Sequence, residues 1–444
     1  MLFNRLKWNV YLVYHLWGQA QFPFKPLEVI KKIQSRRVQR IVSYAYKAVP
    51  YYRETMRKLG LVPEDFKTVD DLSKLPVLEG SQIQRDPAYF VSTRQPISNY
   101  IKLQSGGSTG EPRTIYYNPS ALFLNSAYGE RGRSVITSLV GKSLGYRVTV
   151  FTSPLSTSYK IHRFIQNHTW FPPPLKIQCQ YLSLYDSPKK NVPLMNEFKP
   201  EILISYGSYL QMLFSYLEDA RTFFHHPLAI MYSSDGLCSS IRRLIQERFG
   251  IPVFGHYGAV EALSMGFECP SHLGLHVNMD FYPIRIVNKK GETLPVNECG
   301  DLIVSNLINY ATVLLNYHLG DKAAAAPDQC PCGRTLPLIL FPQGRTDDIL
   351  KSESGESINP NVIYTCFDSE ESVRQYKIVQ EDAYHFKVYL IATETCDCEN
   401  LRQRVTTKFK NHFGENVNVD IRFVDSIDRT KAGKLKVIVS MQNQ

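Results

Sequence analysis

The stretch EILISYGSYLQMLFSYLEDA, residues 201–220, decides the fold class of this 444-residue chain. Its first residues are apolar enough for a buried strand, and the segment after Gly207 repeats apolar residues at helical spacing. The same order returns at 229–258, where the strand AIMYSSDG precedes a helical pattern and a second strand, PVFGHYG. Because strands that alternate with helices are typical of layered domains, we predict an α/β fold.

The segments before this core predict helices and one hairpin. A helical pattern covers residues 27–59, and Pro50 interrupts it. A glycine-rich turn lies between two apolar-aromatic strands within 101–117. The apolar run at 8–17 is too short to span a bilayer. It favours a packed N-terminal helix, with a helix that makes weak contact with a membrane surface as the alternative.

The segments after the core change in texture. Beyond about residue 280, strands and turns follow one another closely, which indicates a β-rich subdomain. From about 348 to the end, strand, helix and strand alternate, as in a small α+β domain. We therefore predict a large N-terminal domain, residues 1–346, with layered sheets and helices plus the β-rich subdomain. A small mobile domain, residues 347–444, follows it.

Composition limits the class of partner and the compartment. The chain has 51 Lys and Arg against 41 Asp and Glu, a net charge of +10, which favours anionic partners without singling out nucleic acid. The densest basic segment, within 31–40, alternates with apolar residues at helical spacing and is interpreted as a solvated helix face. Nine dispersed cysteines favour a reducing compartment, so we expect a cytoplasmic protein. No stretch of about 20 apolar residues predicts a transmembrane helix.

The strongest local chemical signal is the loop SGGSTGEP, residues 105–112. Its glycines allow close approach of the backbone to an anion, and successive N–H groups there form an anion-binding nest. An ordinary flexible turn is the alternative. The loop is not a Walker A motif, because no Gly-Lys-Ser/Thr closes it, and no GxGxxG follows a strand.

Further motifs follow this loop in a fixed order. They are HYGAVEA (256–262), YHLGD (317–321), GRTDD (344–348) and DRTKAGKLK (428–436). Together with the loop they resemble the adenylate-forming superfamily of acyl-CoA ligases, luciferases and adenylation domains, over nearly the whole chain. The segments KAVPYYRE (47–54) and CPCGRTLP (330–337) resemble one branch of it, phenylacetate–CoA ligase and the capsular-polysaccharide-associated proteins similar to it.

The resemblance implies an activity and its cofactors. An enzyme of this kind uses ATP and Mg²⁺ to join AMP to a small carboxylate, and then passes the acyl group to an acceptor, here most simply CoA. Two alternatives stay open. In the first, the acceptor is an amine or hydroxyl in polysaccharide or natural-product assembly. In the second, the chain is a degenerate ligase fold that binds its ligands without catalysing a reaction. The expected partners are small molecules, not nucleic acid, and a homodimer stays open.

The resemblance also implies roles for individual residues. Tyr257 and Gly258 would lie beside the adenine, Asp321 would accept hydrogen bonds from the ribose hydroxyls, and Glu261 would bind Mg²⁺ as a carboxylate ligand. The full set expected around ATP is Ser105, Gly106, Gly107, Ser108, Thr109, Gly110, Ser234, Asp235, Gly236, Tyr257, Gly258, Asp321 and Arg345.

A lysine near the C-terminus is the expected catalytic cation. Lys434 would stabilise the charge that builds on the α-phosphate oxygens, more in the transition state than before it. Lys431 and Lys436 lie close in sequence and are its alternatives. Asp347-Asp348 would form the hinge that brings the lysine in and withdraws it. Where a lysine is usual after the glycine loop, this chain has Glu111, and Arg113 is an alternative cation.

Cysteines and histidines suggest a structural metal. Cys330 and Cys332, with Cys269 and His276, offer the thiolate and imidazole ligands of a closed tetrahedral zinc site. His272 is the alternative histidine. Members of the resembling branch carry similar cysteines. Reduced, partly buried cysteines with unrelated histidines are the other interpretation.

Overall fold

The computed structural model describes residues 2–105, 112–327, 329–340, 350–358, 363, 366–367, 370, 372–393, 395–430 and 433–440. The chain forms two compact units, each built from separate pieces of sequence. Unit 1 comprises Met1–Gly145, Pro154–Lys176 and Phe254–Phe341, and unit 2 comprises Tyr146–Ser153, Ile177–Val253 and Pro342–Gln444.

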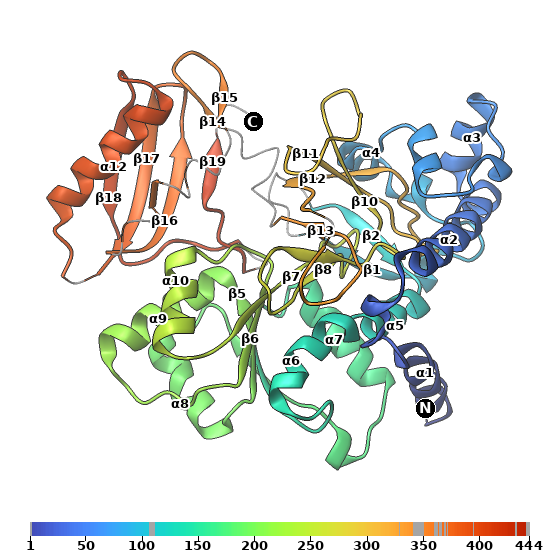
Figure 1. Cartoon of the computed structure of the whole chain (residues 1–444), viewed down its shortest axis with the longest axis horizontal. Helices are drawn as coiled ribbons and strands as arrows, with labels where there is room; N and C mark the ends of the chain where they lie inside the picture. The colour runs from blue at the N-terminus through green and yellow to red at the C-terminus, as the bar shows by residue number, and fades with distance from the viewer. Residues whose placement is uncertain are drawn as a thin grey trace. The chain divides into compact units, whose positions relative to one another are not determined.

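The N-terminal part of unit 1 is helical (Figure 1). Helix α1, Leu2–Leu16, packs on the unit through Trp8, whose ring stacks on Phe123 at 4.3 Å, and through the buried Leu12. The predicted helix at 27–59 divides into α2, Leu27–Ala48, and α3, Pro50–Lys58, at the expected proline. The packed N-terminal helix is therefore confirmed, although its outer face leaves large side chains exposed.

The rest of unit 1 combines small sheets with covering helices. Strands β10, β11 and β12 form an antiparallel sheet, β1 pairs with β2, and β7, β8, β9 and β13 pair antiparallel in that order. The elements are α4 (Gly80–Arg85), β1 (Ile101–Gln104), β2 (Thr114–Tyr117), α5 (Pro119–Tyr128), α6 (Glu130–Val140), α7 (Thr157–His168), β7 (Val253–Tyr257), β8 (Gly266–Glu268), β9 (Leu275–Val277), β10 (Ile284–Val287), β11 (Cys299–Val304), β12 (Tyr317–Ala324) and β13 (Leu338–Ile339). The expected β-rich region after residue 280 is thus present.

The decisive stretch forms the parallel sheet of unit 2. Strand β5, Ile202–Tyr206, lies between β3 and β6 and pairs parallel with both, and β3 also pairs with β4. Apolar residues fill β5 on both faces, as expected for a strand covered by helices. The remaining elements are β3 (Arg147–Thr152), β4 (Gln178–Ser183), α8 (Pro188–Phe198), α9 (Gly207–Ala220), β6 (Ala229–Ser233) and α10 (Ser239–Arg243), which continues as a π-helical turn at Leu244–Arg248.

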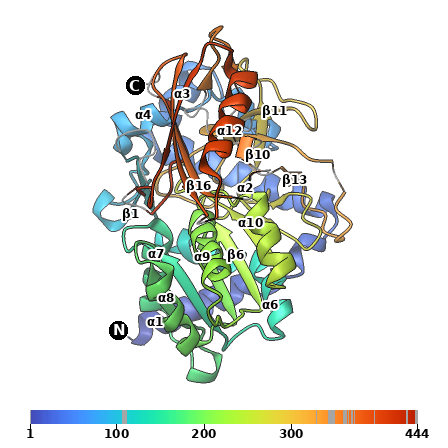
Figure 2. The same ribbon diagram turned by 90° about the vertical axis from the view of Figure 1, so that its left-hand side faces the viewer.

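The C-terminal part of unit 2 is an α+β layer, as predicted. Its sheet has the order β18-β17-β16-β19, with β16 and β17 antiparallel, and α12 lies against one face (Figure 2). Helix α12 buries Leu401, Val405, Phe409 and Phe413 at intervals of four residues. The elements are β14 (Leu350–Lys351), β15 (Ser357–Ile358), β16 (Val373–Gln380), β17 (His385–Ala392), α12 (Cys398–Phe413), β18 (Asn418–Phe423) and β19 (Ile438–Ser440). The predicted boundary at 346/347 lies outside the described residues.

All nine cysteines are free thiols, as the composition indicated. Among the helices that the structure describes, none is both long and apolar enough to cross a membrane.

Candidate functional site

The predicted phosphate loop joins two paired strands. Strands β1 and β2 pair antiparallel, so the loop begins and ends at one edge of the hairpin. Ser105 and Arg113 close it, since each backbone N–H is bonded to the other residue: Ser105 N to Arg113 O at 3.0 Å, and Arg113 N to Ser105 Oγ at 2.9 Å. Gly106, Gly107, Ser108, Thr109 and Gly110 lie outside the described residues.

Strand β12 carries Asp321, which was predicted, and Tyr317, which was not. The Tyr257 hydroxyl donates to Asp321 Oδ2 at 2.6 Å, and the Tyr317 hydroxyl lies 3.3 Å from Glu261 Oε1. Two side-chain contacts thus join β12 to the end of β7 and the turn after it, and they bring Tyr257, Glu261 and Asp321 to the same strand.

A glycine is required in that turn. A Cβ added to Gly258 would lie 2.0 Å from the Leu263 carbonyl oxygen, so no other residue fits without movement of the backbone. The turn brings Glu261 back under β12, where its side chain is only 5% exposed. Gly258 is therefore explained by packing, whatever its distance from a nucleotide.

A cation faces the buried glutamate. Arg113 Nη1 lies 3.7 Å from Glu261 Oε1 and donates to the Tyr317 hydroxyl at 3.2 Å. Burial raises the pKa of Tyr317 well above its ordinary value, and the neighbouring Glu261 carboxylate raises it further. Tyr317 therefore stays protonated, and its hydroxyl donates to Glu261 while it accepts from Arg113.

The predicted lysine lies at the tip of a short hairpin in unit 2. Arg429 and Leu435 form an antiparallel bridge, Thr430 N donates to the Lys434 carbonyl at 2.9 Å, and Lys434 N donates to Thr430 Oγ1 at 3.2 Å. Gly433 has φ +86°, and a Cβ there would lie 2.5 Å from Leu184 Cδ1, so the hairpin packs closely on β4's end. Lys434 is exposed, and its ammonium has no partner among the residues that the structure describes.

The Asp235 carboxylate binds both this hairpin and the start of α9. Its Oδ2 accepts from Leu435 N at 3.3 Å, and its Oδ1 accepts from Ser208 N at 3.1 Å at the start of α9. The Ser208 hydroxyl also donates to Asp235, and Arg429 donates to that hydroxyl and to Gly433 O. Burial raises the pKa of Asp235, while Ser208 and Arg429 lower it. The carboxylate is thus occupied by protein groups, between its neighbours Ser234 and Gly236 at the end of β6.

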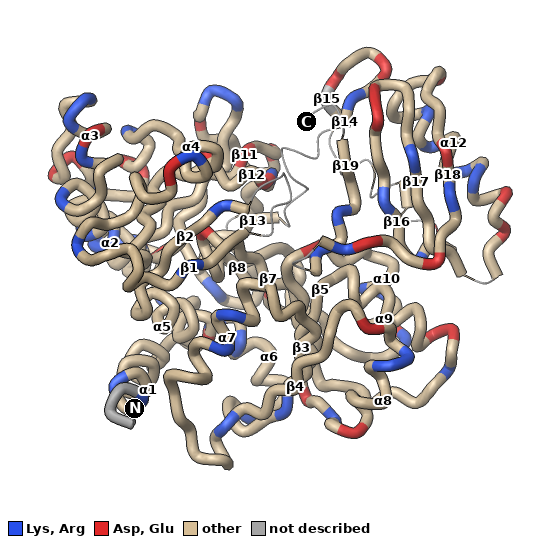
Figure 3. The backbone as a smooth tube through the Cα atoms, turned by 180° about the vertical axis from the view of Figure 1, so that it is seen from behind, with Lys and Arg blue, Asp and Glu red and all other residues tan. Residues whose placement is uncertain are grey.

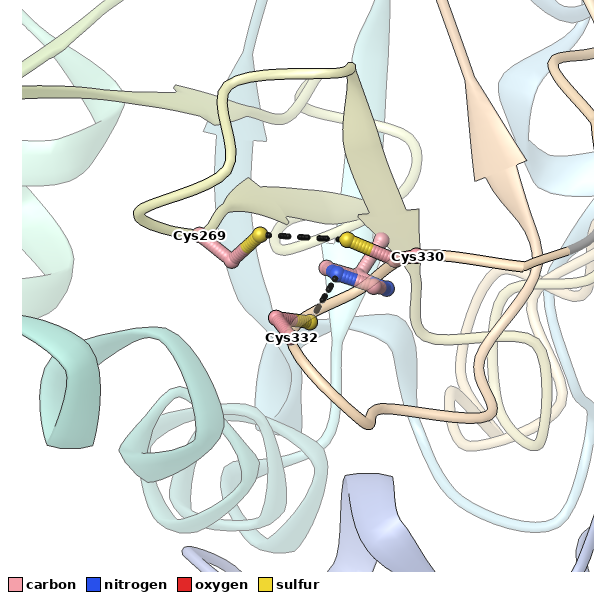
Figure 4. A group of neighbouring side chains, drawn as sticks. Cys269, Cys330 and Cys332 are labelled. Atoms are coloured by element: carbon pink, nitrogen blue, oxygen red, sulfur yellow. Dashed lines mark hydrogen bonds between the residues drawn. The ribbon is translucent and has the colours of Figure 1, made fainter.

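The predicted metal ligands converge in unit 1 (Figure 4). One ligand atom from each of Cys269, His276, Cys330 and Cys332 lies within 4.8 Å of the others. Cys269 Sγ is 3.5 Å from Cys330 Sγ, and Cys332 Sγ is 3.3 Å from His276 Nε2. Burial lowers the pKa of His276 to about 4, so its imidazole is neutral, the form that binds a metal. Its other nitrogen, Nδ1, lies 3.2 Å from the Leu336 carbonyl, which orients the ring.

The alternative histidine has a different partner. His272 Nδ1 lies 2.8 Å from Glu268 Oε1, and its ring stacks on Phe254. The prediction preferred His276 and kept His272 as the alternative; the pairing of β8 with β9, which places His276 opposite Phe267, and the cluster of the four ligand atoms support His276.

Three predicted residues near the C-terminal boundary have no described position. Arg345 and the hinge Asp347-Asp348 lie outside the described residues. Sequence reasoning did not assign Tyr317, Ser208 or Arg429, although Tyr317 heads the YHLGD motif and Arg429 lies within DRTKAGKLK. Those motif positions were the available signal.

Comparisons with known proteins agree with these features. Residues 350–441 match the CapK C-terminal domain. The phenylacetate-coenzyme A ligase of Thermus thermophilus is 25% identical, over 96% of this chain and 99% of its own length. Protein CapK of Staphylococcus aureus is 24% identical, over 92% of this chain and 89% of its own length.

Solved structures share the fold. A 2-hydroxyisobutyryl-CoA ligase in the postadenylation state, in complex with R3-HIB-AMP, has a TM-score of 0.77 at 16% identity, over 96% of this chain and 92% of that chain. The O-succinylbenzoate coenzyme A synthetase of Bacillus subtilis, in complex with ATP and magnesium ion, has a TM-score of 0.53 at 14% identity, over 76% and 68%.

The chain therefore has the α/β fold of the adenylate-forming CoA ligases. Within that class, its sequence relatives are phenylacetate–CoA ligases and CapK, and they indicate an AMP-forming ligase. The family resemblance stated from the motifs is confirmed.

Proposed function

We propose that this chain uses ATP to convert a small carboxylate to an acyl-adenylate and then transfers the acyl group to CoA. The observation that carries the proposal is the pair of contacts to β12, Tyr257 to Asp321 and Tyr317 to Glu261, in a chain that matches a phenylacetate–coenzyme A ligase over 99% of that ligase's length. The identity of the acid is not part of the proposal.

Three groups of unit 1 are assigned to the nucleotide. Asp321 accepts from the ribose hydroxyls, in place of or beside the Tyr257 hydroxyl that it now binds. Glu261 is a buried carboxylate beside the guanidinium of Arg113, and it would hold a magnesium ion as a hard oxygen ligand. With Glu261 as a metal ligand, Arg113 would be left to pair with a phosphate, because its guanidinium and the metal would compete for the same carboxylate. Ser105 and the glycine loop after it bind the terminal phosphates.

Lys434 is assigned to the carboxylate–phosphate chemistry. Its exposed ammonium is supported by a docked hairpin rather than by ion pairs of its own. An ammonium aimed at the α-phosphate stabilises the extra negative charge of the transition state. Of its predicted alternatives, Lys431 lies outside the described residues, and Lys436 is already engaged with other groups.

Asp235 and Arg429 are assigned a positioning role in the same step. The Asp235 carboxylate is shared between the N-terminus of α9 and the hairpin that carries Lys434. Arg429 binds Ser208 and Gly433, so it ties the two ends of the hairpin to the same helix. These residues would hold the lysine for adenylation, although they are expected to touch no reacting atom.

The cysteine cluster is assigned to zinc. Three thiols and one neutral imidazole with an oriented ring fit a closed tetrahedral site, and four protein ligands leave no position for an attacking water. Zinc would supply structural support there. It would tie β9 to the segment before β13, and no step of the reaction passes through it.

A different acceptor is the second candidate function. Residues 350–441 match the CapK C-terminal domain and the relatives include CapK beside the CoA ligases, so an acceptor other than CoA, an amine or a hydroxyl, is kept as the second candidate. The adenylation residues are the same in both cases, so the acceptor alone separates them.

One experiment tests both candidates. The purified protein is supplied with ATP, Mg²⁺ and a panel of carboxylic acids, and pyrophosphate release is measured with and without CoA. Release that depends on one class of acid supports adenylation. Mass spectrometry then separates a CoA thioester from an amide or ester. ATP binding without pyrophosphate release, across every acid, would favour a binding protein instead.

A further inference from the structure

A basic depression lies in unit 1, apart from every residue assigned above. It encloses about 720 Å³ between helix α2, the segment after β-bridge residue Val91, and the loop before β12. Its charged lining residues are Arg36, Arg40, Lys47 and Arg94, and all four side chains are exposed. No acidic residue lines it among those that the structure describes. Figure 3 shows the basic positions along α2.

The cations of this depression differ from other arginines of the unit. Arg37, on the same helix, turns inward and pairs with the buried Asp280 at 2.8 Å. Arg133 pairs with Glu130 on α6. Within the described parts of the chain, Arg36 and Arg40 have no such carboxylate partner. Like charges gathered without counter-charges create a positive potential, which a bound anion relieves.

The floor of the depression is aromatic and fixed. The rings of Tyr44 and Tyr310 meet edge to face at 4.9 Å, and the Tyr44 hydroxyl donates to the Tyr310 carbonyl at 3.1 Å. Tyr310 N in turn donates to Asn118 at 2.9 Å. Arg40 and Tyr310 both line the depression.

The wall that carries Arg94 is also fixed by its backbone. Ser92 N donates to the Ala311 carbonyl at 2.9 Å, and Thr93 N donates to the Ala48 carbonyl at 2.8 Å. Arg94 N donates to Ser92 Oγ at 3.2 Å. The segment is therefore held between the end of α2 and the loop after Tyr310. Only the long side chains need to order when a ligand binds, which limits the entropic cost.

We propose that this depression binds the phosphate groups of an anionic ligand. Guanidinium groups form paired, charge-assisted hydrogen bonds with phosphate oxygens, and three of the four cations here are arginines. The depression is open to solvent, so its four cations can meet phosphate oxygens without a buried cavity. The ligand is a phosphorylated small molecule or a phospholipid headgroup, which share this chemistry. The proposal extends the solvated helix face predicted for residues 31–40, and it does not depend on adenylation.

The test compares charge reversals inside and outside the depression. Pyrophosphate is titrated calorimetrically into the wild type, Arg40→Glu and Lys32→Glu. Both variants change the net charge equally on α2, but Lys32 does not line the depression. Any binding at the proposed nucleotide site is common to all three proteins. We expect Arg40→Glu to weaken one binding event at least tenfold, and Lys32→Glu to stay within twofold. Arg94→Glu, on a loop rather than a helix, should repeat the loss, and thermal unfolding checks that each variant folds.

A second arm identifies the source of the phosphate. The same proteins are floated with phosphatidylcholine vesicles, with and without phosphatidylglycerol. Flotation that needs the anionic lipid and is lost in Arg40→Glu assigns the phosphate to a lipid headgroup. Loss of pyrophosphate binding alone assigns it to a free metabolite. Equal weakening by Arg40→Glu and Lys32→Glu, or no binding of either probe by the wild type, overturns the proposal.

Discussion

Replacing Asp235 with asparagine tests whether this residue positions the catalytic lysine. Asparagine keeps one acceptor oxygen for Ser208 N but loses the charge and the second acceptor that serves Leu435 N at 3.3 Å. A hydrogen bond to a charged group contributes about 1.5–3 kcal/mol. Since about 1.4 kcal/mol corresponds to a factor of ten in rate, adenylation should slow roughly 10- to 100-fold.

Two half-reactions, measured separately, distinguish an effect on adenylation from an effect on acyl transfer. Acid-dependent ATP–pyrophosphate exchange reports adenylation, and thioester formation from a synthetic acyl-adenylate and CoA reports the transfer step. We expect Asp235→Asn to slow the first through kcat, with the KM for ATP nearly unchanged, and to leave the second within about twofold. Asp219→Asn is the matched control, because Asp219 lies at the other end of α9 and pairs with Arg374.

A double variant tests whether Asp235 affects adenylation through Lys434. If Asp235 acts through the lysine, Asp235→Asn should cost nothing further in a Lys434→Ala background. An equal loss in both backgrounds would refute the positioning role, and so would a raised KM for ATP at constant kcat, since that result would place Asp235 at the adenine.

Three further predictions follow from unit 1. Metal analysis should find about one zinc per chain, and Cys332→Ser should lose it and lower Tm by about 5 °C or more, whereas Cys299→Ser should do neither; a metal-free, equally stable wild type would contradict the zinc assignment. Asp280→Asn should lower the free energy of unfolding at pH 7 by about 3–5 kcal/mol in urea, because it leaves Arg131 buried without its partner. Burial raises the pKa of Asp280, but Arg131 and Arg37 outweigh burial and hold that pKa below 3.8. The loss of unfolding free energy in Asp280→Asn should therefore be at its full size above pH 3.8 and should disappear as the pH falls through the folded-state pKa. A loss of the same size at every pH would contradict this prediction. Tyr317→Phe should raise the Mg²⁺ concentration for half-maximal pyrophosphate exchange several-fold, because Glu261 loses its hydroxyl donor, and an unchanged magnesium dependence would exclude that role.

The sequence predicted the fold class because local patterns carry it. Apolar strands next to helical repeats at 201–220 and 229–258 specify α/β layering without knowledge of any distant contact. Pro50 predicted the break between α2 and α3 for a similar reason, since it has no backbone N–H to donate within a helix.

The contacts around the candidate site were harder to predict from the sequence, because they join residues that are far apart in the chain. Nothing local indicates that Tyr317 meets Glu261, or that Ser208 and Leu435 share one carboxylate. Asp235 was predicted from its motif to border the adenine, but the residues that bind its side chain come from 27 and 200 positions away. The choice between His272 and His276 likewise required the strand pairing.

For the basic segment 31–40, helical spacing predicted only part of the structure. Helical spacing separated the apolar from the charged face of α2, but it could not distinguish Arg37, which turns to Asp280, from Arg36 and Arg40 at the surface depression. That distinction depends on Arg94 and Tyr310, which join the helix only in the folded chain.

The most direct test of the adenylation proposal compares two neighbouring lysines in acid-dependent ATP–pyrophosphate exchange. With an acid that the wild type accepts, Lys434→Ala should lower the exchange rate at least 100-fold, while Lys436→Ala should retain most of it. Equal exchange by Lys434→Ala and the wild type would contradict the account.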